Sequence, residues 1–341
     1  MNTIQLKSKT TMMNDMMTKG ERKMDGKIVI TLIGLIVGLA IAPLQASFSD
    51  KDAGSRGAQF LKLPVGAKYI GMGEVGTALA KDANAIYYNV AGLASLGYKS
   101  AEYMYSGYSI SNKSDGESNP GQHWIAFAMP ISESIGSAGV GFQYYTAGDI
   151  NKTDIKNASL GTFNPSDLAV NLSYARKVME QSLGLNLKII SSKIENTATT
   201  VAVDLGYQAK PMMDEKLMLG AAFQNLGGSL KYETESAKLP IMIKLGSAYK
   251  VMDNWVTALD VVFPEDNSPN LGLGTDYVHQ INEDVSVAGR LGYNSRTRKV
   301  GGFSGLSFGA GLNFRMALLD FAWTPMGDIG STFKISAGVK F

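Results

Sequence analysis

The chain has 341 residues, of which 45% are hydrophobic, only 18% are charged and 38 are glycine, whereas soluble domains average about 25% charged residues and about 7% glycine. This composition excludes a disordered chain and does not suit an ordinary soluble α/β enzyme. The formal charge of +2 does not indicate nucleic-acid binding, because residues 1–46 hold six of the 32 basic and three of the 30 acidic residues, which leaves 26 basic against 27 acidic ones and no basic cluster.

Residues 1–46 have the pattern of a secretory signal peptide. A basic region ends at Lys27, 14 uncharged residues follow, and the small residues of "APLQA" predict cleavage after Ala46. The apolar run is short for crossing about 30 Å of hydrocarbon as an anchor helix. Both Met1 and Met24 fit as the start of translation. The absence of cysteine is compatible with export and excludes thiol catalysis and cysteine-based metal sites.

The next segment, residues 47–97, contains a G-x-G-x-x-G spacing at Gly71, Gly73 and Gly76. A dinucleotide-binding turn needs a strand before it, a helix after it and an acidic residue about 20 positions later. The preceding "LKLPVGAKY" makes a poor strand, and no acid lies near position 96. We therefore predict no nucleotide cofactor, and we expect these glycines to allow close packing of the backbone.

From residue 98 to the end the pattern is that of strands. Val285, Val287 and Leu291 alternate with Ser286 and Arg290, and this period of two recurs along the chain. No later stretch has helical spacing. We predict an all-β fold with fourteen strands that begin near residues 98, 122, 135, 167, 181, 199, 216, 240, 254, 269, 284, 305, 316 and 330.

The connections between these strands alternate between long and short. An even strand number, short turns at one end and longer loops at the other are typical of a transmembrane antiparallel β-barrel of the outer membrane. An aromatic residue also ends the apolar face of each strand that runs toward a short turn, from the fourth strand onward. A shared depth for these residues predicts an interfacial girdle, formed by Tyr174, Tyr207, Tyr249, Tyr277, Phe314 and Phe341.

Charged residues inside the strands lie on the face opposite the apolar one. A Lys or Arg facing lipid at mid-bilayer would cost about 2–4 kcal/mol, which explains their placement toward the lumen. Both signs occur, so we expect ion pairs across a narrow lumen and no single-sign ion filter. The predicted lumen-facing charges are Lys188, Asp204, Lys244, Asp260, Asp276, Arg290 and Asp320.

No constellation of residues indicates catalysis or metal binding. "GLSFG" at residues 305–309 matches G-x-S-x-G, but it lies within an alternating strand and lacks the strand–turn–helix elbow that exposes a nucleophile. His123 and His279 are far apart and have no carboxylate at a diagnostic spacing. We therefore predict no enzyme activity, no catalytic residue, no cofactor and no metal.

Residues 54–96 resemble the N-terminal segment of the PorV/PorQ proteins, within the FadL-like barrel superfamily. The family pattern D-A-x-A-x-x-x-N-P-A-G-L is met except that Val90 replaces proline. The resemblance implies that residues 47–97 form a short helical, glycine-rich plug inside an outer-membrane barrel of residues 98–341. The implied plug motif comprises Gly71, Gly73, Gly76, Asp82, Asn89 and Gly92.

The resemblance also implies a function. PorV/PorQ proteins are non-enzymatic outer-membrane components of type IX secretion, which dock secreted cargo domains or a surface partner. The alternative is a FadL-like transporter of hydrophobic compounds. The expected partners are outer-membrane lipid together with either cargo or secretion-system proteins or a hydrophobic small molecule, and no nucleic acid.

Overall fold

The computed structural model describes residues 52–110, 118–156, 158–233 and 235–341. The predicted signal peptide and its cleavage site lie outside the described residues. Among the residues described, no helix is both long and apolar enough to cross a membrane.

Residues 100–340 form a closed antiparallel barrel of 14 strands, which confirms the predicted fold class. Strands that follow one another in the barrel pair as neighbours, and the first strand closes on the last through pairs from Ser100↔Lys340 to Ile110↔Gly330. Each strand begins within two residues of the predicted position. The barrel strands are β1 (Ser100–Ile110), β2 (Gly121–Ser132), β3 (Gly136–Thr146), β6 (Ser166–Val178), β7 (Gln181–Lys193), β8 (Thr197–Gln208), β9 (Leu217–Gly227), β12 (Met242–Met252), β13 (Trp255–Pro264), β14 (Asn270–Gln280), β15 (Val285–Asn294), β16 (Leu306–Phe314), β17 (Ala317–Pro325) and β18 (Gly330–Lys340).

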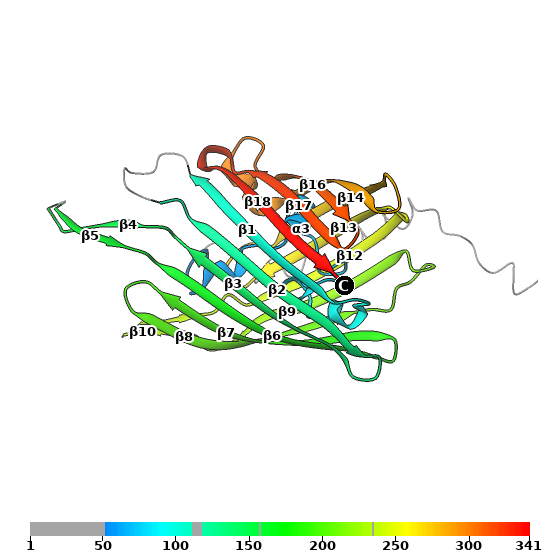
Figure 1. Cartoon of the computed structure of the whole chain (residues 1–341). Helices are drawn as coiled ribbons and strands as arrows, with labels where there is room; N and C mark the ends of the chain where they lie inside the picture. The colour runs from blue at the N-terminus through cyan, green and yellow to red at the C-terminus, as the bar shows by residue number, and fades with distance from the viewer. Residues whose placement is uncertain (1–51, 111–117, 157, 234) are drawn as a thin grey trace, which may run out of the picture. The chain divides into compact units, whose positions relative to one another are not determined.

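The two ends of the barrel differ in their connections (Figure 1). At one end, here called the long-loop end, the hairpins β4–β5 (Ile150–Thr153 and Ser159–Phe163) and β10–β11 (Ser229–Tyr232 and Glu235–Lys238) are inserted between barrel strands. The long-loop end also carries the 3-10 turns η4 (Ser295–Val300) and η5 (Gly327–Ile329). The opposite end is the short-turn end.

The alternation of loop lengths expected from the sequence fails at one place. The connection 194–196 at the long-loop end is shorter than the connection 209–216 at the short-turn end. A short connection at the long-loop end is possible because β7 and β8 pair along their whole length, from Ser182↔Gln208 to Lys193↔Thr197.

The outer surface of the barrel is apolar. Tyr174, Tyr207, Tyr277, Phe314 and Phe341 of the predicted girdle are 39% to 56% exposed, and Tyr249 is half-buried. Exposed apolar side chains around a closed barrel are stabilised by lipid and would be unfavourable in water. The protein is an outer-membrane barrel.

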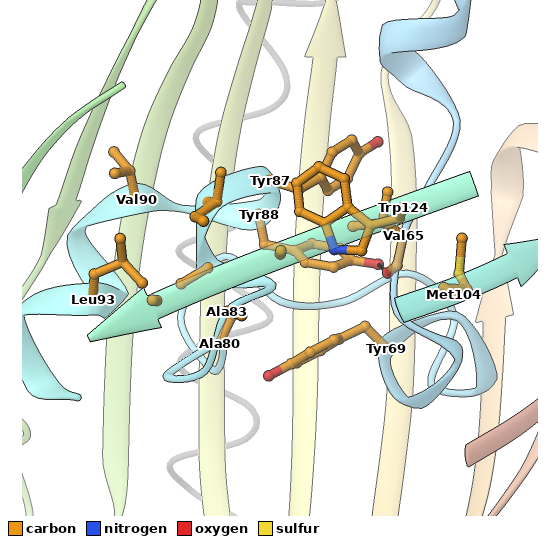
Figure 2. Close-up of a cluster of buried hydrophobic side chains, with 14 of the residues drawn as sticks. Val65, Tyr69, Ala80, Ala83, Tyr87, Tyr88, Val90, Leu93, Met104 and Trp124 are labelled. Carbon is orange, nitrogen blue, oxygen red and sulfur yellow. Dashed lines mark hydrogen bonds between the residues drawn. The ribbon is translucent and has the colours of Figure 1, made fainter. Parts of the chain in front are cut away.

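The interior is packed around the N-terminal segment, residues 52–99. This segment contains the short helices η2 (Gln59–Lys62), α3 (Ala67–Gly71), α4 (Ala85–Tyr88) and η3 (Val90–Ser95). Figure 2 shows Tyr87 and Tyr88 of α4 gathered with Tyr69 of α3 and with Trp124 of β2. The ring centroids of Tyr69 and Tyr88 are 4.8 Å apart, and the Tyr87 and Trp124 rings meet edge to face at 6.4 Å.

Candidate functional site

The N-terminal segment runs through the barrel from one end to the other. Near its start, the Gly57 amide donates to the Lys238 carbonyl oxygen (2.9 Å) beside the β10–β11 hairpin of the long-loop end. At its finish, the Lys99 amide donates to the Phe341 carbonyl oxygen (2.9 Å) at the short-turn end. The barrel interior is therefore occupied along its length by this segment.

A buried carboxylate holds the start of the segment. Asp266, in the connection 265–269, accepts hydrogen bonds from Lys62 Nζ (2.8 Å) and Gln59 Nε2 (2.8 Å). Burial alone would raise the pKa of Asp266, but the hydrogen bonds from these two side chains and the charge of Lys62 lower it overall. The carboxylate is thus kept ionised as an anchor for the segment.

The three glycines of the G-x-G-x-x-G spacing lie at close contacts, two of them with the barrel wall and one within the segment. A Cβ on Gly71 would lie 2.8 Å from the Gly309 Cα, and one on Gly73 would lie 2.5 Å from the Leu273 carbonyl oxygen. Gly73 also has a φ of +75°, which favours glycine. At Gly76, a Cβ would overlap the side chain of Tyr88 within the segment itself. The spacing therefore serves close packing.

The amide groups of this stretch donate to side chains of the wall. The Gly73 amide donates to Ser307 Oγ (3.0 Å). The carboxylate of Asp260 accepts from the amides of Gly76 (2.9 Å) and Thr77 (2.9 Å) and from the Thr77 hydroxyl (2.7 Å). Because these amides already have partners on β13 and β16, they are not free to bind phosphate.

The remaining residues of the expected plug motif make contacts within the segment and, at Asn89, with the wall. Asp82 accepts from the Tyr69 hydroxyl (2.8 Å). Asn89 Nδ2 donates to the carbonyl oxygens of Thr77 (2.8 Å) and Tyr207 (2.9 Å), which ties the segment to β8. A Cβ on Gly92 would overlap a backbone carbonyl oxygen of the segment, so this glycine is required by packing.

A polar cluster of three residues that joins the segment to β1 and β2 was not predicted from the sequence. Asn84 Nδ2 donates to Glu102 Oε2 (2.6 Å), and the Trp124 indole donates to Asn84 Oδ1 (3.0 Å). Asn84 lies between two alanines of the matched pattern. Its importance depends on partners that follow it by 18 and 40 residues, so local sequence carries no signal for it.

The lumen-facing charges form ion pairs along the wall. Arg290 contacts both Asp276 (2.9 Å) and Asp320 (2.6 Å), and Lys188 pairs with Asp204 (2.8 Å). Asp276 and Arg290 are register partners on adjacent strands. The expectation of pairs that cross the lumen is therefore wrong, because the N-terminal segment lies in between.

The other two predicted charges face the segment. Lys244 Nζ lies 4.6 Å from the centroid of the Tyr87 ring, in a cation–π contact, and Asp260 accepts the three hydrogen bonds described above. The charged residues of the described wall include both signs, and several of them pair directly. These described residues therefore form no ring of a single sign.

A small cavity remains between the segment and the wall at the long-loop end. Its volume is about 80 Å³, and its lining combines the apolar side chains of Leu63, Ile70 and Met326 with charged groups. An apolar cavity of about 150 Å³ is known to bind benzene. The cavity is therefore too small for an aromatic hydrocarbon as long as the segment keeps this position.

Two cations border the cavity in different ways. Arg296 pairs with Glu74 of the segment (2.6 Å) and donates to the Lys62 carbonyl oxygen (3.0 Å). Lys334, buried on β18, donates to the hydroxyls of Thr324 (2.6 Å) and Thr332. Within the described residues, no carboxylate forms an ion pair with Lys334. Lys334 was not among the predicted lumen-facing charges, although its parity in the strand places it on the inward face.

The described residues contain no group of three or more His, Cys, Asp or Glu side chains placed to hold a metal. His123 lies on β2, and its Nδ1 is 2.9 Å from the Tyr103 hydroxyl. Its ring neighbours the exposed rings of Tyr105 and Tyr144 on the outer face. His123 therefore belongs to the lipid-facing surface and not to the interior.

No protein-family model and no curated protein matches the chain. Among solved structures, it is similar to the Pseudomonas putida toluene transporter TodX (11% identity over 81% of this chain and 97% of that chain, TM-score 0.56). It is also similar to the Ralstonia pickettii toluene transporter TbuX (12% identity, 82% and 98%, TM-score 0.55). A Pseudomonas aeruginosa FadL homologue is similar too (14% identity, 81% and 98%, TM-score 0.54).

At these identities the likeness is one of fold. The chain has the FadL-like barrel fold that the sequence analysis expected. TodX and TbuX are described as toluene transporters, and none of the three structures is described as an enzyme. The narrower PorV/PorQ relationship stays a prediction.

Proposed function

We propose that this barrel passes small hydrophobic compounds across the outer membrane, with residues 52–99 as a plug that must shift to open the path. The observation that carries the proposal is the partly apolar cavity between Leu63–Glu74 and the wall, in a barrel whose fold is that of hydrocarbon channels. Because short turns face the periplasm in bacterial barrels, the long-loop end with this cavity faces the outside.

The contacts of the segment indicate how the path opens. The cavity is bordered on the segment side by Leu63, Ile70 and Glu74. Its volume must grow to take a hydrocarbon, and the wall cannot widen without breaking strand pairing. The segment therefore yields, and its start near Gly57 lies beside the β10–β11 hairpin of the long-loop end.

A reversible tether tests this mechanism. A Cβ on Gly57 would lie 3.0 Å from the Ala237 Cβ, close to the separation of about 3.5–4.5 Å in disulfides. The chain has no cysteine of its own, so Gly57→Cys/Ala237→Cys would carry a single engineered pair. We expect toluene uptake by cells that make this variant to fall when the pair is oxidised and to recover on reduction.

The two single-cysteine variants are the controls, and their uptake should not respond to oxidant. The transport proposal fails if deletion of the whole protein leaves toluene uptake unchanged. If deletion lowers uptake but the tether does not, the protein transports but the start of the segment does not move.

A second candidate function is a docking barrel for secretion, as the PorV/PorQ resemblance of residues 54–96 implies. The close packing of Gly71 and Gly73 against the wall favours it, because a sealed barrel suits docking better than passage. Deletion would then strand exported cargo in the periplasm while toluene uptake stays normal. Normal cargo release combined with lost uptake would exclude this candidate.

A further inference from the structure

A second and larger recess lies at the opposite, short-turn end of the barrel. Its volume is about 350 Å³, within the usual range of about 300–1,000 Å³ for small-molecule sites. Ala78, Lys81 and Ser95 of the N-terminal segment contribute to its lining, together with the ends of β6, β8, β9 and β12. The connection 209–216 forms one side of the recess, and this is the longest turn at that end.

The recess has an excess of positive charge. Its charged lining residues are Lys81, Lys177, Lys210, Lys250, Glu180 and Glu215. Lys210 pairs with Glu180 (2.6 Å). In the part of the chain that the structure describes, no ion pair is formed by Lys81, Lys177 or Lys250. Three lysines therefore share the recess with the single remaining carboxylate of Glu215.

The lysines influence one another. The pKa of Lys81 is lowered, first by its burial and then by the charges of Lys250 and Lys177. Lys81 belongs to the N-terminal segment, whereas Lys177 and Lys250 belong to β6 and β12. Glu215 acts on Lys81 in the opposite sense and offsets part of the repulsion between the lysines, and a further anion among the three lysines would offset more of it.

The turn beside the recess has unusual backbone geometry. Met213, Asp214 and Glu215 have successive φ values of +58°, +57° and +62°, in the left-handed region that non-glycine residues rarely adopt. Conformations of this kind are strained and cluster at ligand-binding sites. This observation is independent of the charges and points to the same recess.

We propose that the recess binds a small multivalent anion, a molecule with two or more phosphate or carboxylate groups, that bridges Lys81 of the N-terminal segment to Lys177 and Lys250 of the wall. Ammonium groups on separate elements suit separate acidic groups on one molecule, and the Ser182 and Gln208 side chains offer further polar contacts. Bound anion would fasten the segment at the short-turn end. The site is separate from the cavity at the long-loop end and does not depend on the transport proposal.

Calorimetric titration of the purified full-length protein in a non-ionic detergent at low salt tests the site. Inorganic pyrophosphate and citrate serve as probes for phosphate and carboxylate groups, and acetate is the monovalent control. We expect saturable binding of one pyrophosphate or citrate per chain, and stronger binding of one of them shows which acidic group the site prefers. Acetate should bind at least about tenfold more weakly.

Variants localise the binding. Lys81→Gln and Lys177→Gln should each weaken it about tenfold or more. Lys231→Gln removes the same charge from the exposed surface of β10 at the long-loop end, and it should bind like the wild type. Lys177 is exposed on the wall, so its variant remains informative if Lys81→Gln fails to fold.

Three results would overturn the proposal: no saturable binding of either probe, acetate binding as tightly as pyrophosphate, or equal losses in the Lys177→Gln and Lys231→Gln variants. Bound pyrophosphate should also slow proteolysis of residues 78–95 in the wild type. That protection should disappear in Lys177→Gln, which a merely structural role of the lysine would not produce.

Discussion

Replacing Arg290 by methionine removes a cation that contacts two buried carboxylates. Arg290 Nε lies 2.9 Å from Asp276, and Nη1 lies 2.6 Å from Asp320. The side chains of these three residues are only 3%, 6% and 10% exposed. Methionine fills much of the same volume, so the main effect is the loss of charge compensation and of the hydrogen bonds.

The size of the effect follows from burial. Removing one partner of a buried ion pair costs about 3–5 kcal/mol, because the remaining charge is left uncompensated. Two carboxylates are left here, but Lys68 Nζ, 4.0 Å from Asp276, compensates part of one of them. We therefore expect Arg290→Met to lower the free energy of unfolding by about 3–5 kcal/mol.

Urea unfolding of the barrel in detergent micelles, followed by tryptophan fluorescence, measures this loss. Arg315→Met is the matched control, because its pair with Asp284 (3.1 Å) is 66% and 51% exposed, and exposed pairs contribute about 0–1 kcal/mol. The triple variant Arg290→Met/Asp276→Asn/Asp320→Asn should regain at least half of the lost stability. The reasoning is refuted if Arg290→Met behaves like Arg315→Met, or if the triple variant is no more stable than the single one.

Three further predictions concern orientation, packing and pH. Ile155 is fully exposed on the long-loop side, so a cysteine there should react with an impermeant thiol reagent on intact cells. A cysteine at Asp253, in a short turn, should not react. The reverse labelling pattern would mean that the barrel has the opposite orientation. The methyl group of Gly274→Ala would overlap a backbone carbonyl of the N-terminal segment, whereas the methyl group of Gly289→Ala meets open space. The segment should therefore be cleaved faster by a protease in Gly274→Ala and at the wild-type rate in Gly289→Ala. Because the pKa of Asp266 is lowered below its unfolded value of about 3.9, its contribution is complete above that value and is lost as the pH falls through the folded pKa. When the pH is lowered from about 6 to about 3, the urea midpoint should therefore fall less for Asp266→Asn than for the wild type. Equal falls would show that this carboxylate does not contribute to the pH dependence of stability.

The barrel itself could be predicted because its physics is local. Because lipid lies outside and a filled lumen lies inside, apolar and polar residues alternate along every strand. Leu205 and Asp204 are neighbours in the sequence, so this alternation places them on opposite faces. Leu205 is 47% exposed and Asp204 is buried. The lengths of the connections are less constrained. The sequence therefore has no clear pattern that predicts the short connection 194–196 or the inserted hairpins β4–β5 and β10–β11.

The partners inside the lumen could not be predicted, because they are distant in sequence. Parity placed Asp260 inward, but its donors at Gly76 and Thr77 precede it by 184 and 183 residues. The same holds for Glu102, whose partner Asn84 belongs to the segment. A charged residue that faces a lumen can pair with the wall, with the segment or with a ligand, and only the fold decides among these outcomes.

The distribution of these contacts also bears on how the segment can move. From Gly76 to Asn89 it is fixed to the wall by Asp260 on β13 and by the Tyr207 carbonyl on β8, so displacing this part would leave a buried carboxylate without its donors, at a cost of about 1–3 kcal/mol or more. The part that borders the cavity is held at the long-loop end by the ion pairs Lys62–Asp266 and Glu74–Arg296, and Asp266 is itself fully buried. Opening there leaves this one buried carboxylate without its donors, whereas displacing the whole segment leaves Asp260 without its donors as well. Opening from the long-loop end is therefore less costly than displacing the whole segment, and it would leave the lysine-lined recess at the other end intact.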